Sequence, residues 1–94
     1  MAQAQVAVNC PVGAWTELTN ADATTFSFQV LAGPVEIRAT TGAAPAASDR
    51  GFIYRDYEKE TAITLTTFFN TAAVDRVFAR PVAGRAGLLL VAHA

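Results

Sequence analysis

A strict alternation of apolar and polar residues is the feature that most limits what this chain can fold into. In residues 25–31, Phe26, Phe28 and Val30 occupy every second position, with polar side chains between them. Successive side chains of a β-strand point to opposite faces, so this pattern predicts a strand with one buried face. Residues 35–40 repeat the pattern. The chain is therefore predicted to build its core from half-buried strands.

Turn-forming residues interrupt the alternation at regular intervals. The segments of β-type sequence are residues 3–9, 14–18, 25–31, 35–40, 52–57, 62–68, 74–80 and 88–92. A spacing of about 8–12 residues between short strands is typical of a compact sandwich or barrel. We predict a single all-β domain over residues 1–94, an antiparallel β-sandwich or barrel of about seven or eight short strands. Residues 1–5 could serve as an extended N-terminal arm.

The same pattern predicts three details of the strand arrangement. A short Ala-Gly-Pro link joins residues 25–31 to 35–40, which predicts that they pair as an antiparallel hairpin. Phe68 and Phe69 break the phase of the segment that precedes them, as at a strand end or a bulge. Residues 88–92 are apolar at every position, which predicts a central or doubly covered strand.

Charged residues are few and unevenly placed. The chain has 15 of them with a net charge of −1, and seven of the 15 fall within residues 49–60. Nucleic-acid binding requires clustered Lys and Arg, so this balance argues against it, and against binding to a membrane surface. The N-terminus lacks the pattern of a signal peptide, and the longest apolar run, 86–92, is far shorter than the ~20 residues that cross a bilayer. We therefore expect synthesis in the cytoplasm without a visible export signal.

No group of residues has the spacing of a catalytic or metal site. His93 is the only histidine and Cys10 the only cysteine, whereas a structural zinc site takes about four such ligands. We expect Cys10 to be a small buried apolar side chain. Ser27 and Ser48 lie outside any Gly-x-Ser-x-Gly turn. The sequence predicts a protein that is not an enzyme and has no cofactor and no metal.

The charge-dense window contains alternate carboxylates at Asp56, Glu58 and Glu60. Paired carboxylates can perform acid–base chemistry on glycosides. Alternate acids on an extended segment would share one exposed side, and Arg55 and Lys59 beside them would neutralise their charge. A surface that faces solvent or a partner is therefore the favoured interpretation.

Tyrosines lie among these charges. Tyr54, Arg55 and Tyr57 fall in the window, and Trp15 lies near the N-terminus. Amphipathic aromatic side chains and arginine are enriched where proteins dock on one another. These four residues are the predicted interface, and a plain surface loop is the alternative.

Three stretches of the sequence carry a family resemblance. They are Trp-Thr-Glu-Leu at 15–18, Val-Glu-Ile-Arg-Ala-Thr at 35–40 followed by a small-residue loop at 44–51, and Val-Phe-Ala-Arg-Pro at 77–81 before a C-terminal strand that ends in His-Ala. In style and order, the chain resembles the small virion structural proteins of tailed bacteriophages. The resemblance implies a β-sandwich without catalytic residues, most similar to capsid decoration (cement) proteins. It also implies a location in the virion after synthesis in the host cytoplasm, and the partners are copies of itself and the major capsid protein.

Other functions stay open at this point. A head–tail connector or tail-associated module would have the same composition. A small carbohydrate-binding β-sandwich would use Trp15, Tyr54 and Tyr57 as a stacking platform open to solvent. A small hydrolase would need a pocket with convergent polar groups, for which the sequence offers no source.

Overall fold

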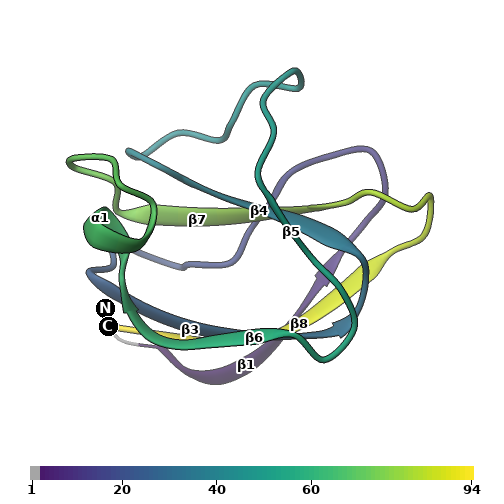
Figure 1. The fold of residues 1–94 in the computed structure, drawn as a ribbon, viewed down its shortest axis with the longest axis horizontal. Helices are drawn as coiled ribbons and strands as arrows, with labels where there is room; N and C mark the ends of the chain where they lie inside the picture. Colours follow the sequence, from purple (N-terminus) through teal and green to yellow (C-terminus); the bar gives the residue numbers. More distant parts are fainter. Residues whose placement is uncertain (1–2) are drawn as a thin grey trace.

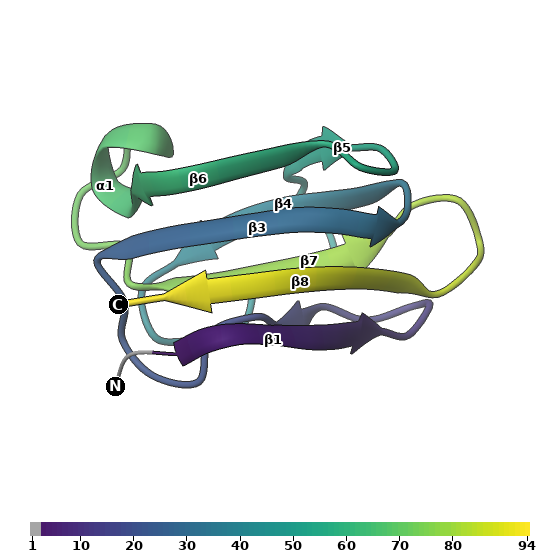
Figure 2. The ribbon, with the colours of Figure 1, turned by 90° about the horizontal axis from the view of Figure 1, so that it is seen from below.

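The computed structural model describes residues 3–94 and confirms the all-β prediction. The strands are β1 (Gln3–Cys10), β2 (Thr16–Glu17), β3 (Thr25–Ala32), β4 (Val35–Thr40), β5 (Phe52–Tyr54), β6 (Lys59–Thr64), β7 (Arg76–Pro81) and β8 (Gly87–His93), and α1 (Leu65–Phe68) is a single helical turn. They form two four-stranded antiparallel sheets that lie face to face as a sandwich (Figure 1). Sheet A has the order β1-β8-β3-β6, and sheet B has the order β2-β7-β4-β5 (Figure 2).

The pairing of the strands follows one simple rule. β1 pairs with β8, β2 with β7, β3 with β6, and β4 with β5. The first four strands thus pair with the last four in reverse order, as in one long two-stranded antiparallel ribbon. The ribbon is wrapped so that consecutive pairs fall alternately in sheet A and sheet B. This is the arrangement of a jelly roll, the eight-stranded sandwich found in viral capsid and lectin domains.

The predicted hairpin between residues 25–31 and 35–40 is wrong. β3 pairs with β6 and β8 in sheet A, whereas β4 pairs with β5 and β7 in sheet B. The polar groups of the link are satisfied from outside it, because the Gly33 N–H donates to Asp56 Oδ1 at 2.6 Å and the Gly33 carbonyl accepts from Arg85 at 2.7 Å. Each strand buries one apolar face, and the two faces meet across the core instead of lying side by side.

The predicted strand phase is confirmed. Phe26, Phe28 and Val30 of β3 are buried, and the alternate residues of that strand are partly exposed. Leu89 of β8 lies beside them in sheet A, and Ile37 of β4 faces them from sheet B in the same apolar cluster. The core therefore fills the space between the sheets with large apolar residues, and Cys10, at 0% exposure, belongs to it as expected.

Several boundaries differ from the prediction. Residues 65–68 form α1 in place of a strand end, because the chain turns after Leu65 has been buried. β2 is two residues long, and β5 ends at Tyr54. Of the predicted arm at residues 1–5, residues 3–5 belong to β1, and residues 1–2 lie outside the described residues. β8 lies between β1 and β3, so the prediction of a central strand is confirmed.

Candidate assembly surfaces

The outer face of sheet A is almost free of charge. Its strands contain only two charged side chains, Lys59 and Glu60. Glu60 accepts a hydrogen bond from the Tyr54 hydroxyl of the other sheet, which leaves Lys59 as the one charge on the outer side. We call this surface the neutral face; its residues include Ala7, Ser27, Gln29, Thr61, Leu90 and Ala92. Figure 2 looks onto it, and a shallow hollow of about 160 Å³ lies over its centre.

The outer side of sheet B has the opposite character. All five ion pairs within residues 3–94 lie on its strands or the loops beside them. Arg76 of β7 reaches Glu17 of β2 at 2.8 Å and Asp22 at 2.9 Å. The pKa of Arg76 is raised, first by its hydrogen bond to Asp22 and then by that to Glu17. These charges are used within the molecule, where they tie strands and loops together.

Glu36 is the centre of this ionic side. It lies on the outward side of β4, yet it is only 2% exposed because the loop of residues 41–51 covers it. Its carboxylate accepts hydrogen bonds from Arg80 at 3.0 Å, from Arg50 at 3.1 Å and from the Gly51 N–H at 2.9 Å. Burial alone opposes ionisation, but these hydrogen bonds outweigh it and lower the pKa of Glu36. The charge-dense window therefore contributes Arg50, whose own side chain is exposed, to an ion pair with the buried Glu36 carboxylate.

Gly51 is needed at its position for the loop to cover Glu36. A Cβ atom at residue 51 would collide with the backbone carbonyl of Ile37. Only a residue without a side chain lets the loop backbone lie this close to β4. The close approach is what brings the Gly51 N–H within reach of Glu36.

Trp15, one of the predicted interface residues, belongs to the same structure. The Arg80 guanidinium lies 4.3 Å from the centre of its ring, a cation–π contact. The indole Nε1 donates to the Ala46 carbonyl at 3.1 Å, and Arg80 donates to the Ala47 carbonyl at 2.8 Å. Trp15 and Arg80 thus hold the loop of residues 41–51 against sheet B, and one face of the indole is occupied within the chain.

The other three predicted interface residues separate into two kinds. The Tyr54 ring is half-buried and meets Phe28 edge-on, with ring centres 4.9 Å apart. Burial and the neighbouring Glu60 raise the pKa of Tyr54 to about 12. Arg55 and Tyr57 are exposed, Tyr57 to 71%. Tyr57 also adopts a left-handed backbone (φ 68°), uncommon for a bulky residue, held by its N–H donating to the Val30 carbonyl at 2.6 Å.

These positions do not bring Trp15, Tyr54 and Tyr57 onto one surface. Trp15 precedes β2 at one edge of sheet B, and Tyr54 lies in β5 at the opposite edge.

The carboxylates of the charge-dense window accept hydrogen bonds within the chain. Asp56 accepts from the Gly33 N–H, Glu58 from the Arg55 N–H and Glu60 from the Tyr54 hydroxyl. Each acid therefore fixes a turn or a side chain.

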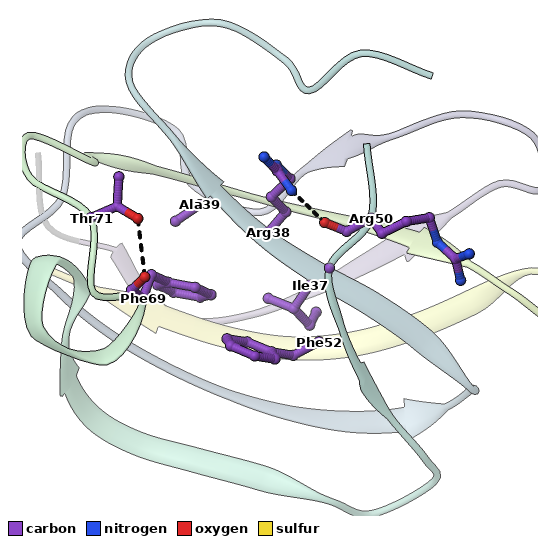
Figure 3. Close-up of a pocket in the computed structure, with 8 residues that line it drawn as sticks. Ile37, Arg38, Ala39, Arg50, Phe52, Phe69 and Thr71 are labelled. Carbon is purple, nitrogen blue, oxygen red and sulfur yellow. Dashed lines mark hydrogen bonds between the residues drawn. The ribbon is translucent and has the colours of Figure 1, made fainter. Parts of the chain in front are cut away.

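A hollow lies between the β4–β5 edge and the segment after α1 (Figure 3). Its volume is about 380 Å³, and Ile37, Ala39, Phe52 and Phe69 supply the apolar part of its wall. The Phe52 and Phe69 rings stack with centres 6.0 Å apart, and Phe52 remains 55% exposed. Arg38 lies on its rim and donates to the Arg50 carbonyl. This lining suits an apolar side chain from a neighbouring molecule.

His93 and Cys10 both lie in the interior of the sandwich. His93 is 5% exposed, and its Nε2 accepts from the Asn20 N–H at 3.2 Å, which places the proton of the neutral ring on Nδ1. Burial lowers the pKa of His93. Burial also raises the pKa of the Cys10 thiol to about 11, although a hydrogen bond with Thr16 opposes the shift. Both groups are therefore uncharged at neutral pH.

Residues 3–94 contain no cluster of three or more His, Cys, Asp or Glu side chains arranged to hold a metal ion. Within the same residues, no helix is long and apolar enough to cross a membrane.

Comparison with known proteins found no matching family model, no matching curated protein and no matching solved structure. The arguments about function therefore rest on the surfaces described above.

Proposed function

We propose that this chain is a non-enzymatic structural protein of a tailed-phage virion, and that it acts as a capsid decoration protein that assembles on the head. The observation that carries the proposal is the neutral face of sheet A. A protein that stays alone in solution usually covers its surface with mixed charges, because charge limits non-specific association. A protein that is fixed by its neighbours can leave a whole face uncharged, since assembly removes that face from water.

The fold supports the same role. Jelly rolls occur in viral capsid domains and in lectins, so the topology is compatible with a virion part and with a glycan-binding module. A stacking platform for a sugar requires aromatic rings on one open surface, whereas Trp15 is covered on one side by Arg80 and the Tyr54 ring packs on Phe28. We therefore favour the virion role. A head–tail connector or a tail-associated module is the second position in which the same surfaces would serve.

Arg55 and Tyr57 provide a second contact point in this proposal. The Tyr57 carbonyl accepts from Gln29, a residue of the neutral face, at 3.1 Å. The turn that carries the exposed Tyr57 ring therefore borders that face. An uncharged face with an aromatic side chain at its border resembles the apolar core and specific anchors of protein–protein interfaces.

The experiment compares the binding of two charge variants to phage heads. Leu90→Lys adds a charge to the centre of the neutral face, and Ser48→Lys adds the same charge to the exposed loop over sheet B. Heads purified after phage induction in cells that encode the chain are stripped and mixed with each purified protein, and occupancy is read from sedimented particles. We expect at least a tenfold loss of affinity for Leu90→Lys and parent-like binding for Ser48→Lys. Absence of the chain from purified virions, or equal binding of the two variants, would refute the proposal.

A further inference from the structure

The four edge strands of the sandwich differ in how well they can pair with another strand. β1 and β6 are the edges of sheet A, and β2 and β5 are the edges of sheet B. β2 has two residues and β5 has three, too few for a ladder of useful length. β6 has six residues, but Ala62 interrupts its extended backbone with φ 52°, and the Ala62 N–H already donates to Ser27 Oγ at 2.7 Å. A bend and a charge on an edge strand both hinder further pairing, and β6 also carries Lys59.

β1 carries no charge, and the one irregularity in its pairing with β8 lies between Gln3 and Val6. It is eight residues long, it contains no charged residue and no proline, and β8 is its only neighbour in the sheet. From Val6 to Cys10 its register with β8 is regular. In an edge strand, half of the backbone N–H and C=O groups point away from the sheet and offer themselves to a further strand. Between Val6 and Asn9, these groups make no hydrogen bond to a loop or side chain of residues 3–94.

The side chains of β1 show which strand would fit. Ala7 pairs with Leu90 and lies on the neutral face, whereas Val6 and Val8 pair with the buried residues Val91 and Leu89 on the core side. Val6 is nevertheless 44% exposed because sheet A ends there. A second strand would cover Val6 if it placed an apolar side chain directly opposite.

A second copy of β1 does so when the two strands run antiparallel about a two-fold axis at Ala7. Ala7 then lies opposite Ala7 of the second copy, and Val6 lies opposite Val8. Gln5 lies opposite Asn9, so two amides that can donate and accept meet on the outer face. Directly opposed side chains in such a pair are close enough to interact, and this register brings no charges together. The register also keeps inward and outward side chains on their own faces, as a shared sheet requires.

We propose that β1 is a homodimer interface, through which two copies join their A sheets into one continuous eight-stranded sheet with the neutral face doubled in width. This inference deepens the proposed assembly role and rests on it by identifying a second copy of the chain as the first partner. The interface is isologous, because the same residues contribute from both copies. It also removes the long uncharged edge from solvent.

Two variants at Ala7 test the interface, each with a matched control at Thr61, an exposed residue on the other edge of the same sheet. Ala7→Lys places two positive charges directly opposite each other at the axis, and Thr61→Lys adds the same charge elsewhere. Light scattering after size exclusion should give the parent and Thr61→Lys twice the 9.9 kDa mass of one chain, and Ala7→Lys the single mass. Circular dichroism checks that each variant is folded.

Ala7→Cys and Thr61→Cys test the same interface by disulfide formation, which does not require that an added charge disrupt the dimer. Opposed residues of an antiparallel pair have Cα atoms about 4.5–5.5 Å apart, within the range that a disulfide spans. Under mild oxidation, Ala7→Cys should form a covalent dimer at least tenfold faster than Thr61→Cys, and the native Cys10 is buried in both. A monomeric parent, or a dimer that Ala7→Lys leaves intact and Ala7→Cys does not trap, would overturn the proposal. Particle occupancy is a separate reading, so a monomeric parent that binds heads normally refutes only the β1 interface.

Discussion

The two outer faces of this sandwich show two ways in which a sheet can treat its solvent side. Sheet B carries all five ion pairs within residues 3–94 and is covered by the loop of residues 41–51. Sheet A carries one charge on its outer side, Lys59, and no loop is bonded over its centre in the described residues. The outer side of sheet B is covered within the chain, whereas the outer side of sheet A is uncovered in the described residues, and in our proposal a partner covers it.

Under the proposed function, the cluster of charges in the sequence does not mark the docking surface. The charge-dense window supplies Asp49 and Arg50 to the internal network around Glu36 and Arg38. The proposed docking surface is instead the neutral face, whose strands carry little charge in the sequence. Charged groups with internal partners are already satisfied, whereas a charge-poor face can leave water without stripping ions of their hydration.

The largest expected effect is on sheet B. Arg80→Ala removes two hydrogen bonds to Glu36, one cation–π contact and two bonds to the loop carbonyls. Because the carboxylate of Glu36 stays buried and loses a partner, we expect a loss of about 3–5 kcal/mol in the free energy of unfolding. Chemical denaturation measures it. If the free energy of unfolding falls by less than about 1 kcal/mol, the ion pairs of sheet B contribute little to stability and the comparison between the faces is wrong.

The stability contributed by His93 in sheet A and by Glu36 in sheet B should be lost in two different pH ranges. The lowered pKa of His93, inside sheet A, means that the unfolded chain binds this proton more readily, so stability falls as the pH drops below its ordinary value of 6.5. The pKa of Glu36 is also lowered, so its contribution is complete above its ordinary value of 4.5 and is lost below it. Denaturation at a series of pH values should therefore show two declines.

One variant at each residue tests which group causes each of the two declines in stability. His93→Gln should flatten the decline just below pH 6.5, and Glu36→Gln should flatten the one below pH 4.5 while lowering stability at neutral pH. If Glu36→Gln leaves the acid profile unchanged, the ion pairs of sheet B do not hold the carboxylate charged.

A smaller effect is expected from Trp15→Phe. The change keeps an aromatic ring beneath Arg80 but deletes the indole donor to the Ala46 carbonyl. Loss of one partly exposed hydrogen bond corresponds to about 0.5–1.5 kcal/mol. Hydrogen exchange in residues 41–51 should rise more than exchange in β3. Uniform exchange in the two segments would show that Trp15 does not hold the loop.

The smallest effect is expected on the outer side of sheet A. Lys59→Ala removes the only charge of the neutral face, and we expect a change within about 0.5 kcal/mol in the stability of the isolated domain. The same variant should bind phage heads at least as well as the parent. A clear loss of binding would mean that Lys59 pairs with an acidic group on the particle, and the neutral description of the face would need revision.

The fold was largely predictable from local pattern, but the strand pairing was not. Alternation in residues 25–31 correctly assigned Phe26 and Phe28 to the buried face, because burial follows directly from the period of two. The period contains no information on which strand lies alongside. The short link at Gly33 therefore predicted a hairpin, whereas in the structure the chain crosses there from sheet A to sheet B.

The candidate surfaces were less predictable for a related reason. Glu36 occupies an outward position in β4, so the sequence gives no sign that the loop directly after β4 folds back and covers it through Arg50 and Gly51. Tyr54 and Tyr57 appear equivalent in the sequence, yet one packs on Phe28 and the other is exposed. The sequence showed a low overall number of charges but could not predict that one face would lack them. The residues of the neutral face come from four strands that become neighbours only on folding.

The ribbon pairing also sets the order in which this molecule can form. β8 is made after all the other strands and lies between β1 and β3, so sheet A has no middle until the ribosome has passed residue 93. Until then β1 lacks the strand with which it pairs in the folded protein. Pairing between such distant segments is slow and leaves sticky intermediates exposed.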